Sequence, residues 1–390
     1  MTPKTIMVVA GDPSGDANAA DLVRALAQAV PNAQFIGAGG PAMADAGVRL
    51  SFNLTDDAAI GPVDAIKKLG SFRTRCRHLA NLAKERRPEL IILVDFYTFN
   101  QRLARAIKRF VRARAGTGSS WAPKIVQYTS PQVWASRPGR AGKLARNIDL
   151  LLCLFPFEKE WYARRGTPLR AEFVGHPLFD RHAAARAASA DANRQAEEIP
   201  TIVLLPGSRT DELKRHLPVM LAAAHQIQAA RPVRFKLVAA DERLADYMRA
   251  FLAARAPKVE IQTGQLADAL STATLAIAST GTVTLECAYF GLPTVALYKT
   301  SFLFHLLARW LVTVKYLAMP NLLADEPLFP EFIQRQATAD NLAKAALDLL
   351  ADAPRRSAIR AKLRQVIQSL GGPGSSRRAA AILLQLTGSV

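Results

Sequence analysis

The stretch LLPGSRTDELKRHLP, residues 204–218, combines residue types that suit phosphate binding. An apolar run at 202–205 leads into a Pro-Gly-Ser-Arg turn, and acidic residues then open a helix pattern. A strand that passes into a helix through such a loop aims backbone N–H groups at an anion. Gly207 allows close approach, Ser208 adds a hydroxyl and an N–H, and Arg209 offers forked donors. The pattern predicts a nucleotide-diphosphate site, with a plain helix start and surface arginine as the alternative.

Two further polar loops follow predicted strands. The loop AGDPSGD places Asp12, Ser14 and Asp16 around a tight glycine turn at the start of a helix pattern. The loop STGTVTLE has the same form, with Glu286 one turn into its helix. A carboxylate in that place can bridge two ribose hydroxyls. Ordinary capping by Asp or Ser, or a first-turn acid that complements the helix dipole, is the alternative for each.

Short apolar strand patterns alternate with amphipathic helix patterns, which is typical of parallel, doubly wound sheets. The first series of strands comprises residues 5–10, 33–38, 89–95, 124–129, 149–155 and 171–175; the second comprises 201–206, 234–240, 259–263, 274–279 and 294–299. After 294–299 the pattern predicts no further strand. Residues 181–200 contain few large apolar side chains and indicate a solvated linker.

We therefore predict an α/β protein with two Rossmann-like, doubly wound domains that face a central cleft. The predicted first domain spans residues 1–180 and is completed by a C-terminal helix at about 370–390, and the second spans 201–369. A length of 390 residues, 50% of them hydrophobic, suffices for two cores. Ligands are expected in the loops that follow the strands.

The cysteines and the N-terminal sequence indicate in which cellular compartment the protein is expected. The cysteines, Cys76, Cys153 and Cys287, are odd in number and widely spaced, which argues against a disulfide framework and a structural zinc site. The first apolar run is too short for a signal peptide and is better explained as a buried strand. We expect a cytoplasmic protein without a metal site or cofactor.

The net charge of +19 calls for an anionic partner or another explanation. Nucleic acid and an anionic membrane face are the two physical candidates. The basic residues lie in helix patterns at 67–87 and 101–114, and no RNA-binding signature or Cys/His finger accompanies them. Solvated helix faces are the alternative. The stretch 301–320 is amphipathic, but His305 and Arg309 make it too polar to span a bilayer.

Eight motifs in a fixed order resemble the lipid A disaccharide synthase family. These inverting glycosyltransferases join UDP-2,3-diacylglucosamine to 2,3-diacylglucosamine 1-phosphate and release UDP. The motifs cover almost the whole chain and are AGDPSGD, FIGAGGPAM, QYTSPQVWASRPGR, LFPFE, FVGHPL, LLPGSR, TGTVTLE and PNLLADEPLFPEFIQ. The resemblance implies a GT-B fold whose C-terminal domain holds most of the sugar nucleotide.

The resemblance also implies a set of binding residues and partners. It places Ser208, Arg209, Thr282, Glu286, Asn321 and Gln334 in the UDP site. The predicted substrate-binding set further contains Gly207, Gly281, Ser14 and Asn100. The lipid substrates imply a protein that docks peripherally on the anionic inner face of the inner membrane and binds no nucleic acid. A homodimer is left open.

Three motifs depart from the family pattern, all of them in the predicted first domain. The usual GEASGD has Asp12 and Pro13 in place of Glu and Ala, and the usual WAW ends in Ser136. The usual PDFN, whose aspartate the resemblance implies to be the catalytic carboxylate, has Thr98 in its place. A threonine hydroxyl cannot serve as a general base at neutral pH.

The remaining candidates for the base are, in order, Asp12, Asp95 and Asp16, with His176 as a further titratable group. Arg209 and the helix N-termini around it would take the charge of the leaving diphosphate. Three interpretations stay open: an active lipid A disaccharide synthase, a related UDP-sugar enzyme with another acceptor or an epimerase activity, and a non-catalytic UDP-sugar-binding relative. Retained UDP binding without transfer would single out the third.

Overall fold

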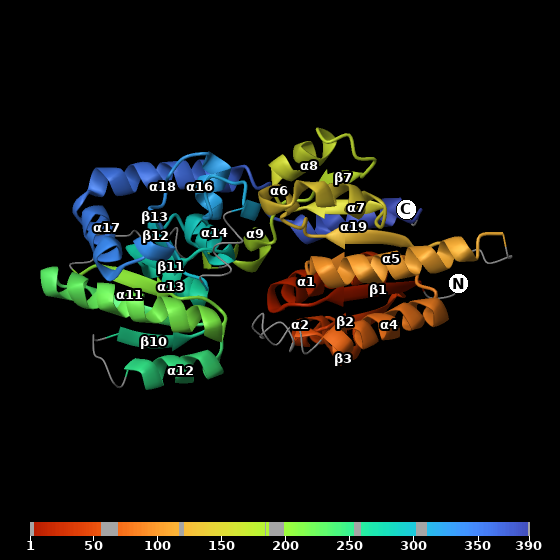
Figure 1. Ribbon diagram of the computed structural model, residues 1–390, viewed down its shortest axis with the longest axis horizontal. Helices are drawn as coiled ribbons and strands as arrows, with labels where there is room; N and C mark the ends of the chain where they lie inside the picture. The colour runs from red at the N-terminus through yellow and green to blue at the C-terminus, as the bar shows by residue number, and fades with distance from the viewer. Residues whose placement is uncertain are drawn as a thin grey trace. The chain divides into compact units, whose positions relative to one another are not determined.

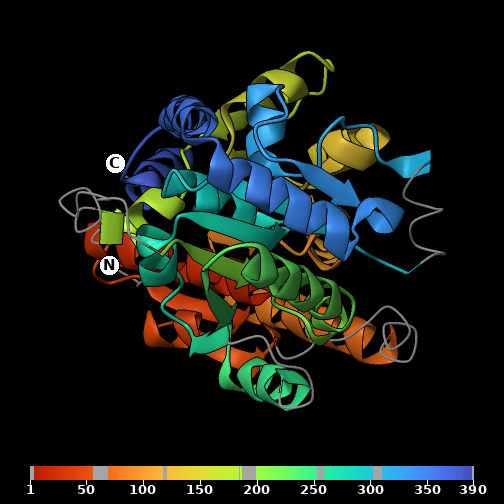
Figure 2. The same ribbon diagram turned by 90° about the vertical axis from the view of Figure 1, so that its left-hand side faces the viewer.

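The computed structural model describes residues 4–55, 69–116, 121–183, 185–186, 199–252, 259–301 and 310–388. The chain forms two compact units, shown in Figure 1 and turned by 90° in Figure 2. The first unit comprises Met1–Phe179 together with Leu370–Val390, and the second comprises Asp180–Ser369. The chain thus passes from one unit to the other twice.

The first unit is built on a seven-stranded parallel sheet with the strand order β3-β2-β1-β4-β5-β6-β7. The central strands are apolar throughout, as expected for parallel strands covered on both faces. Their bounds are β1 Thr5–Ala10, β2 Gln34–Gly39, β3 Arg49–Asn53, β4 Leu90–Val94, β5 Lys124–Tyr128, β6 Leu150–Cys153 and β7 Ala171–Phe173. The strand order reverses beside β1, so the crossover helices lie on opposite faces of the sheet.

The helices of the first unit turn apolar stripes toward this sheet. In α5, Phe99, Leu103 and Ile107 recur every four residues and are buried. The helices are α1 Pro13–Ala29, α2 Pro41–Asp45, α4 Leu69–Arg86, α5 Tyr97–Ala113, α6 Val133–Ser136, η2 Pro138–Arg140, α7 Ala141–Ala145, α8 Pro156–Ala163, α9 Leu178–Arg181 and α19 Ser375–Leu386. The last of these, α19, packs against α1. The unit therefore joins segments that lie far apart in the sequence.

The second unit repeats the architecture with a six-stranded parallel sheet of order β10-β9-β8-β11-β12-β13. Its strands are β8 Thr201–Leu205, β9 Arg234–Ala239, β10 Val259–Thr263, β11 Leu275–Ser279, β12 Thr294–Tyr298 and β13 Glu331–Ile333. Its helices are α11 Thr210–Ala230, α12 Glu242–Leu252, α13 Leu266–Thr272, α14 Thr282–Tyr289, α16 Met319–Ala324, η3 Gln334–Gln336, α17 Ala339–Ala351 and α18 Ala353–Gln368. The predicted α/β class with two doubly wound parallel sheets is confirmed.

One prediction about the second sheet is wrong. A strand does follow residues 294–299 in the sheet, because β13 pairs in parallel with β12, with Leu297 opposite Phe332. It is a three-residue edge strand without a continuous apolar run, so the sequence pattern does not reveal it. The edge strand β3 of the first unit was missed for the same reason, since its residues alternate between polar and apolar types only briefly.

Candidate functional site

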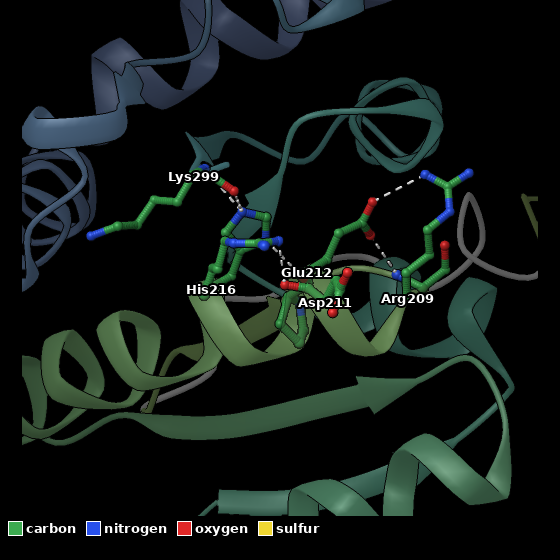
Figure 3. Close-up of polar contacts among 8 residues, drawn as sticks. Arg209, Asp211, Glu212, His216 and Lys299 are labelled. Atoms are coloured by element: carbon green, nitrogen blue, oxygen red, sulfur yellow. Dashed lines mark hydrogen bonds and ion pairs between the residues drawn. The ribbon is translucent and has the colours of Figure 1, made fainter. Parts of the chain in front are cut away.

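The predicted diphosphate loop connects β8 to α11 and is shown in Figure 3. Gly207 has a φ of +124°, and a β carbon there would collide with the Glu212 carboxylate. Glu212 Oε2 accepts a hydrogen bond from the Ser208 N–H at 3.1 Å, and its Oε1 lies 3.3 Å from Arg209 Nη1. Ser208 and Arg209 are exposed. The loop thus presents a backbone N–H and a guanidinium to a carboxylate, the same donors that suit a phosphate.

A second loop lies at the same edge of this sheet. The strands β8 and β11 are neighbours and parallel, so the loops after them, 206–209 and 280–281, leave the same carboxyl edge. Gly281 has a φ of +148° and is exposed, as is Thr282 at the start of α14. Glu286 lies deeper, with a side chain 13% exposed and Oε1 3.4 Å from His182 Nε2. The structure therefore gives Glu286 a protein partner close to the loop.

Two of the residues assigned to the UDP site by resemblance have structural partners. Asn321 is fully buried and exchanges hydrogen bonds of 2.8 Å with the backbone of Phe329, while its Nδ2 also donates to Glu331 Oε1. These bonds hold the turn into β13, and the assignment of Asn321 to the UDP site stays a prediction. Gln334 has a φ of +53°, and its amide, oriented to satisfy both groups, exchanges two 3.2 Å hydrogen bonds with the Thr300 backbone.

In the first unit, the two acidic residues of the AGDPSGD loop accept hydrogen bonds from different backbone segments. Asp12 caps α1 by accepting the Gly15 N–H at 2.7 Å. Asp16 is buried and accepts three backbone N–H groups from the turn into α2, those of Gly40, Ala42 and Met43, at 2.7, 2.9 and 3.2 Å. These bonds give Asp16 a positioning role at the turn into α2, and its role as a base stays a prediction.

Asp95 directly follows strand β4 and has a left-handed conformation, with a φ of +49°. Two buried amides hold this turn: Asn100 Nδ2 donates to the Asp95 carbonyl at 2.9 Å, and Gln127 Nε2 donates to it at 3.0 Å. Asn100 also donates to the Val94 carbonyl at 3.1 Å and is fully buried. Asn100 thus supports the Asp95 turn, and its role in substrate binding stays a prediction.

The Asp95 carboxyl has an unusual protonation equilibrium. Burial, followed by the charges of Asp12 and Glu158, raises its pKa to about 8. Thr98, in the first turn of α5, is exposed, and so is Ser14 in the first turn of α1. A carboxyl that titrates near neutral pH at the carboxyl edge of a sheet is suited to proton transfer.

Two functional candidates were missed by the sequence reasoning. Glu158 is buried in α8, accepts Trp134 Nε1 at 3.0 Å and the Phe155 N–H at 3.1 Å, and burial raises its pKa to about 7. Its place in the motif LFPFE was the available signal. His216 in α11 is fully buried beneath the diphosphate loop. His176, the further titratable candidate, is buried and accepts the Leu178 N–H through Nδ1.

We searched the described residues for metal sites and for membrane-spanning helices, and found neither. Within those residues no group of three or more His, Cys, Asp and Glu side chains could hold a metal ion. Likewise, none of the helices in the described ranges is long and apolar enough to cross a membrane. The three cysteines are buried free thiols.

Two units with doubly wound parallel sheets define a protein of the GT-B fold class, whose members include glycosyltransferases and sugar-nucleotide epimerases. A family model for lipid-A-disaccharide synthetase matches residues 6–385. The chain therefore belongs to the lipid-A-disaccharide synthetase family. The family predicted from the eight motifs is confirmed.

Individual proteins support both the fold class and the family. The lipid-A-disaccharide synthase of Trichlorobacter lovleyi is 35% identical over 392 residues, covering 98% of each chain. The crystal structure of a UDP-N-acetylglucosamine 2-epimerase from Listeria monocytogenes matches with a TM-score of 0.66 at 13% identity, covering 100% of this chain and 98% of the other. The calicheamicin glycosyltransferase CalG4 matches with a TM-score of 0.60 at 16% identity over the whole of both chains. The two structural matches establish the fold alone.

Proposed function

We propose that the protein transfers the 2,3-diacylglucosamine unit of its UDP derivative to 2,3-diacylglucosamine 1-phosphate, forming lipid A disaccharide 1-phosphate and UDP. The observation that carries this proposal is the family match over residues 6–385, in a chain whose diphosphate loop has the geometry described above. The predicted alternatives, another acceptor or a non-catalytic relative, have no comparable support among the relatives, which are named lipid-A-disaccharide synthases.

An inverting transfer of this kind needs two groups from the protein. The acceptor hydroxyl oxygen attacks the anomeric carbon while the bond from that carbon to the diphosphate oxygen breaks, and its electron pair leaves with UDP. A base takes the hydroxyl proton. Arg209 and the N–H groups of the loop supply positive partners for the departing diphosphate.

We assign the base to Asp95, which revises the order predicted from the sequence. Asp12 is engaged as the cap of α1, and Asp16 is fully occupied by the turn into α2. Asp95 is partly buried, and its raised pKa of about 8 makes it a stronger base than an ordinary carboxylate. Asp95 and Thr98 both follow strand β4. The Asp95 carboxylate therefore lies close in the sequence to position 98, where the family has its aspartate.

The direct test is incubation of the protein with both diacylglucosamine substrates, followed by mass spectrometry of the lipid product. The proposal expects a disaccharide 1-phosphate and stoichiometric UDP. UDP binding without any lipid product would favour the non-catalytic alternative, above all if Thr98→Asp switched transfer on. Conversion of the donor sugar without the acceptor would indicate an epimerase.

We further propose that the protein docks on the anionic cytoplasmic face of the inner membrane, where such lipid substrates reside. Part of the surface predicted from the sequence lies outside the described residues, namely Ile66, Lys67, Lys68, His305 and Arg309. Phe72, which follows these lysines in the sequence, is half-buried and packs its ring against Phe96 and Phe99. The support that remains is Trp310, a side chain that is 87% exposed and of a type that anchors proteins at interfaces.

Vesicle co-sedimentation tests this membrane proposal. The wild-type protein is expected to bind anionic vesicles in a salt-sensitive way, because each cation near the surface contributes about 1 kcal/mol. Trp310→Ala should weaken that binding, whereas Trp121→Phe, a change at a half-buried tryptophan of the first unit, should not. Equal binding to neutral and anionic vesicles, or none to either, would contradict the proposal.

A further inference from the structure

His216 links two separate segments of the second unit (Figure 3). It lies in the second turn of α11 and is fully buried. On one side, Nδ1 is 2.7 Å from the carbonyl oxygen of Pro206, the first residue of the diphosphate loop. On the other side, Nε2 is 3.0 Å from the backbone nitrogen of Lys299, directly after β12. The imidazole therefore bridges the loops that follow two strands of the sheet.

The partners of the ring determine its tautomer. The Pro206 carbonyl can only accept, so Nδ1 carries the proton, and Nε2 then accepts the Lys299 N–H. Burial lowers the pKa of His216, which favours this neutral form. Among the charges that face the ring, Glu212 raises the pKa and Arg215 lowers it, and the ring of Tyr298 lies 6.2 Å away. Nε2 also lies 3.2 Å from the Lys299 carbonyl oxygen, so protonation would turn Nε2 from the acceptor of the Lys299 N–H into a donor to that carbonyl, and the N–H would lose its acceptor.

The contact with Lys299 continues to a third segment. Lys299 Nζ donates to the Ala337 carbonyl at 3.2 Å, and the adjacent Thr300 backbone pairs with the Gln334 amide. The diphosphate loop, residues 299–300 and residues 334–337 are thus connected through one buried ring. Within these segments, Ser208, Arg209 and Gln334 are the residues that the resemblance assigns to UDP.

We propose that His216 is a positioning residue for the sugar nucleotide, which sets the distance between the diphosphate loop and the segment held by Gln334. This inference rests on the proposed function, since it takes UDP as the ligand. A loop held in its binding geometry before the ligand arrives loses less conformational freedom on binding. His216 touches no substrate in this scheme and acts through the Pro206 carbonyl and the Lys299 backbone.

Three variants separate the two contacts. His216→Phe keeps a planar aromatic ring, although a larger one, and removes both hydrogen bonds. His216→Asn can keep a donor near Nδ1 for Pro206, and His216→Gln can keep an acceptor near Nε2 for Lys299. The matched control is His225→Phe, because His225 is exposed on the same helix. UDP affinity by calorimetry and thermal unfolding are measured for each.

The proposal expects His216→Phe to weaken UDP binding by about tenfold, the scale of one buried hydrogen bond. His216→Asn should recover part of this loss and His216→Gln less, while His225→Phe should match the wild type. Wild-type affinity should also fall as the pH is lowered and the ring gains a proton, because the Lys299 N–H then loses its acceptor, and by more than in His216→Asn. Because the pKa of His216 is lowered in the folded protein, its contribution to stability is likewise present at neutral pH and lost as the pH falls.

The outcomes distinguish this inference from the proposed function. A His216→Phe protein that is less stable but binds UDP as the wild type does would overturn the positioning role and leave the proposed function intact. The same holds if the pH dependence is identical in the wild type and His216→Asn. A wild-type protein that fails to bind UDP would overturn both.

Discussion

The Asp95→Asn protein is expected to transfer sugar about 10²- to 10⁴-fold more slowly than the wild type, the usual contribution of a general base. Asparagine matches the shape of the side chain and tolerates the left-handed backbone that Asp95 adopts. UDP affinity should stay within about twofold, because the diphosphate loop belongs to the other unit. Single-turnover rates and calorimetry measure the two quantities separately.

The dependence of the rate on pH adds a sharper test of Asp95. A base must be unprotonated, and the pKa of Asp95 is raised to about 8, so transfer should increase with pH up to about 8. The charge of Asp12 contributes to this raised pKa, so Asp12→Asn should shift the rise in rate to lower pH while activity persists. If Asp12→Asn instead abolished transfer at every pH and Asp95→Asn did not, the base would be Asp12.

Stability provides the control against misfolding of the Asp95→Asn protein. A carboxyl whose pKa is raised by folding contributes stability at low pH, and this contribution is lost as the pH rises through about 8. Asparagine cannot ionise, so the variant should unfold at a higher temperature than the wild type above that pH. An inactive variant of lowered stability would carry no information about the base, and Asp95→Ser would then replace it.

The Arg209→Ala protein is expected to bind UDP about 1.5–3 kcal/mol more weakly, the range of a charge-assisted hydrogen bond. Arg209→Lys should recover part of the loss, because lysine keeps the charge without the fork. The ion pair of Arg209 with Glu212 is largely exposed, so its removal should hardly change stability. Lys214→Ala, which removes an exposed charge from the same helix, is the control for net charge. Unchanged UDP affinity in a folded Arg209→Ala protein would contradict the assignment of the loop.

The fold was predictable because its signals are local. Apolar runs that alternate with helix patterns indicate a doubly wound sheet without any knowledge of which strands pair. Among the described strands, the short edge strands β3 and β13 lack such runs. The loops after β1, β8 and β11 were found in the same way, since glycine and polar residues directly follow apolar runs.

The roles of individual site residues were harder to predict because they depend on distant partners. Asp16 reaches a backbone 24 residues further along the chain, and Asn100 turns back to the Asp95 carbonyl. Spacing cannot separate an Asp or Asn that binds backbone from one that binds a ligand, because both tasks need the same donors and acceptors. His216 gave no signal at all, since its partners lie 10 and 83 residues away.

The packing of α19 against α1 has a consequence for biosynthesis. Residues 370–388 leave the ribosome after all of the second unit, yet they belong to the first. The second unit is continuous in sequence and can fold as soon as it emerges, while the first waits with α1 uncovered. The two units are therefore expected to mature in the reverse of their order of synthesis, and a nascent chain stalled before residue 370 should expose the α1 surface to chaperones.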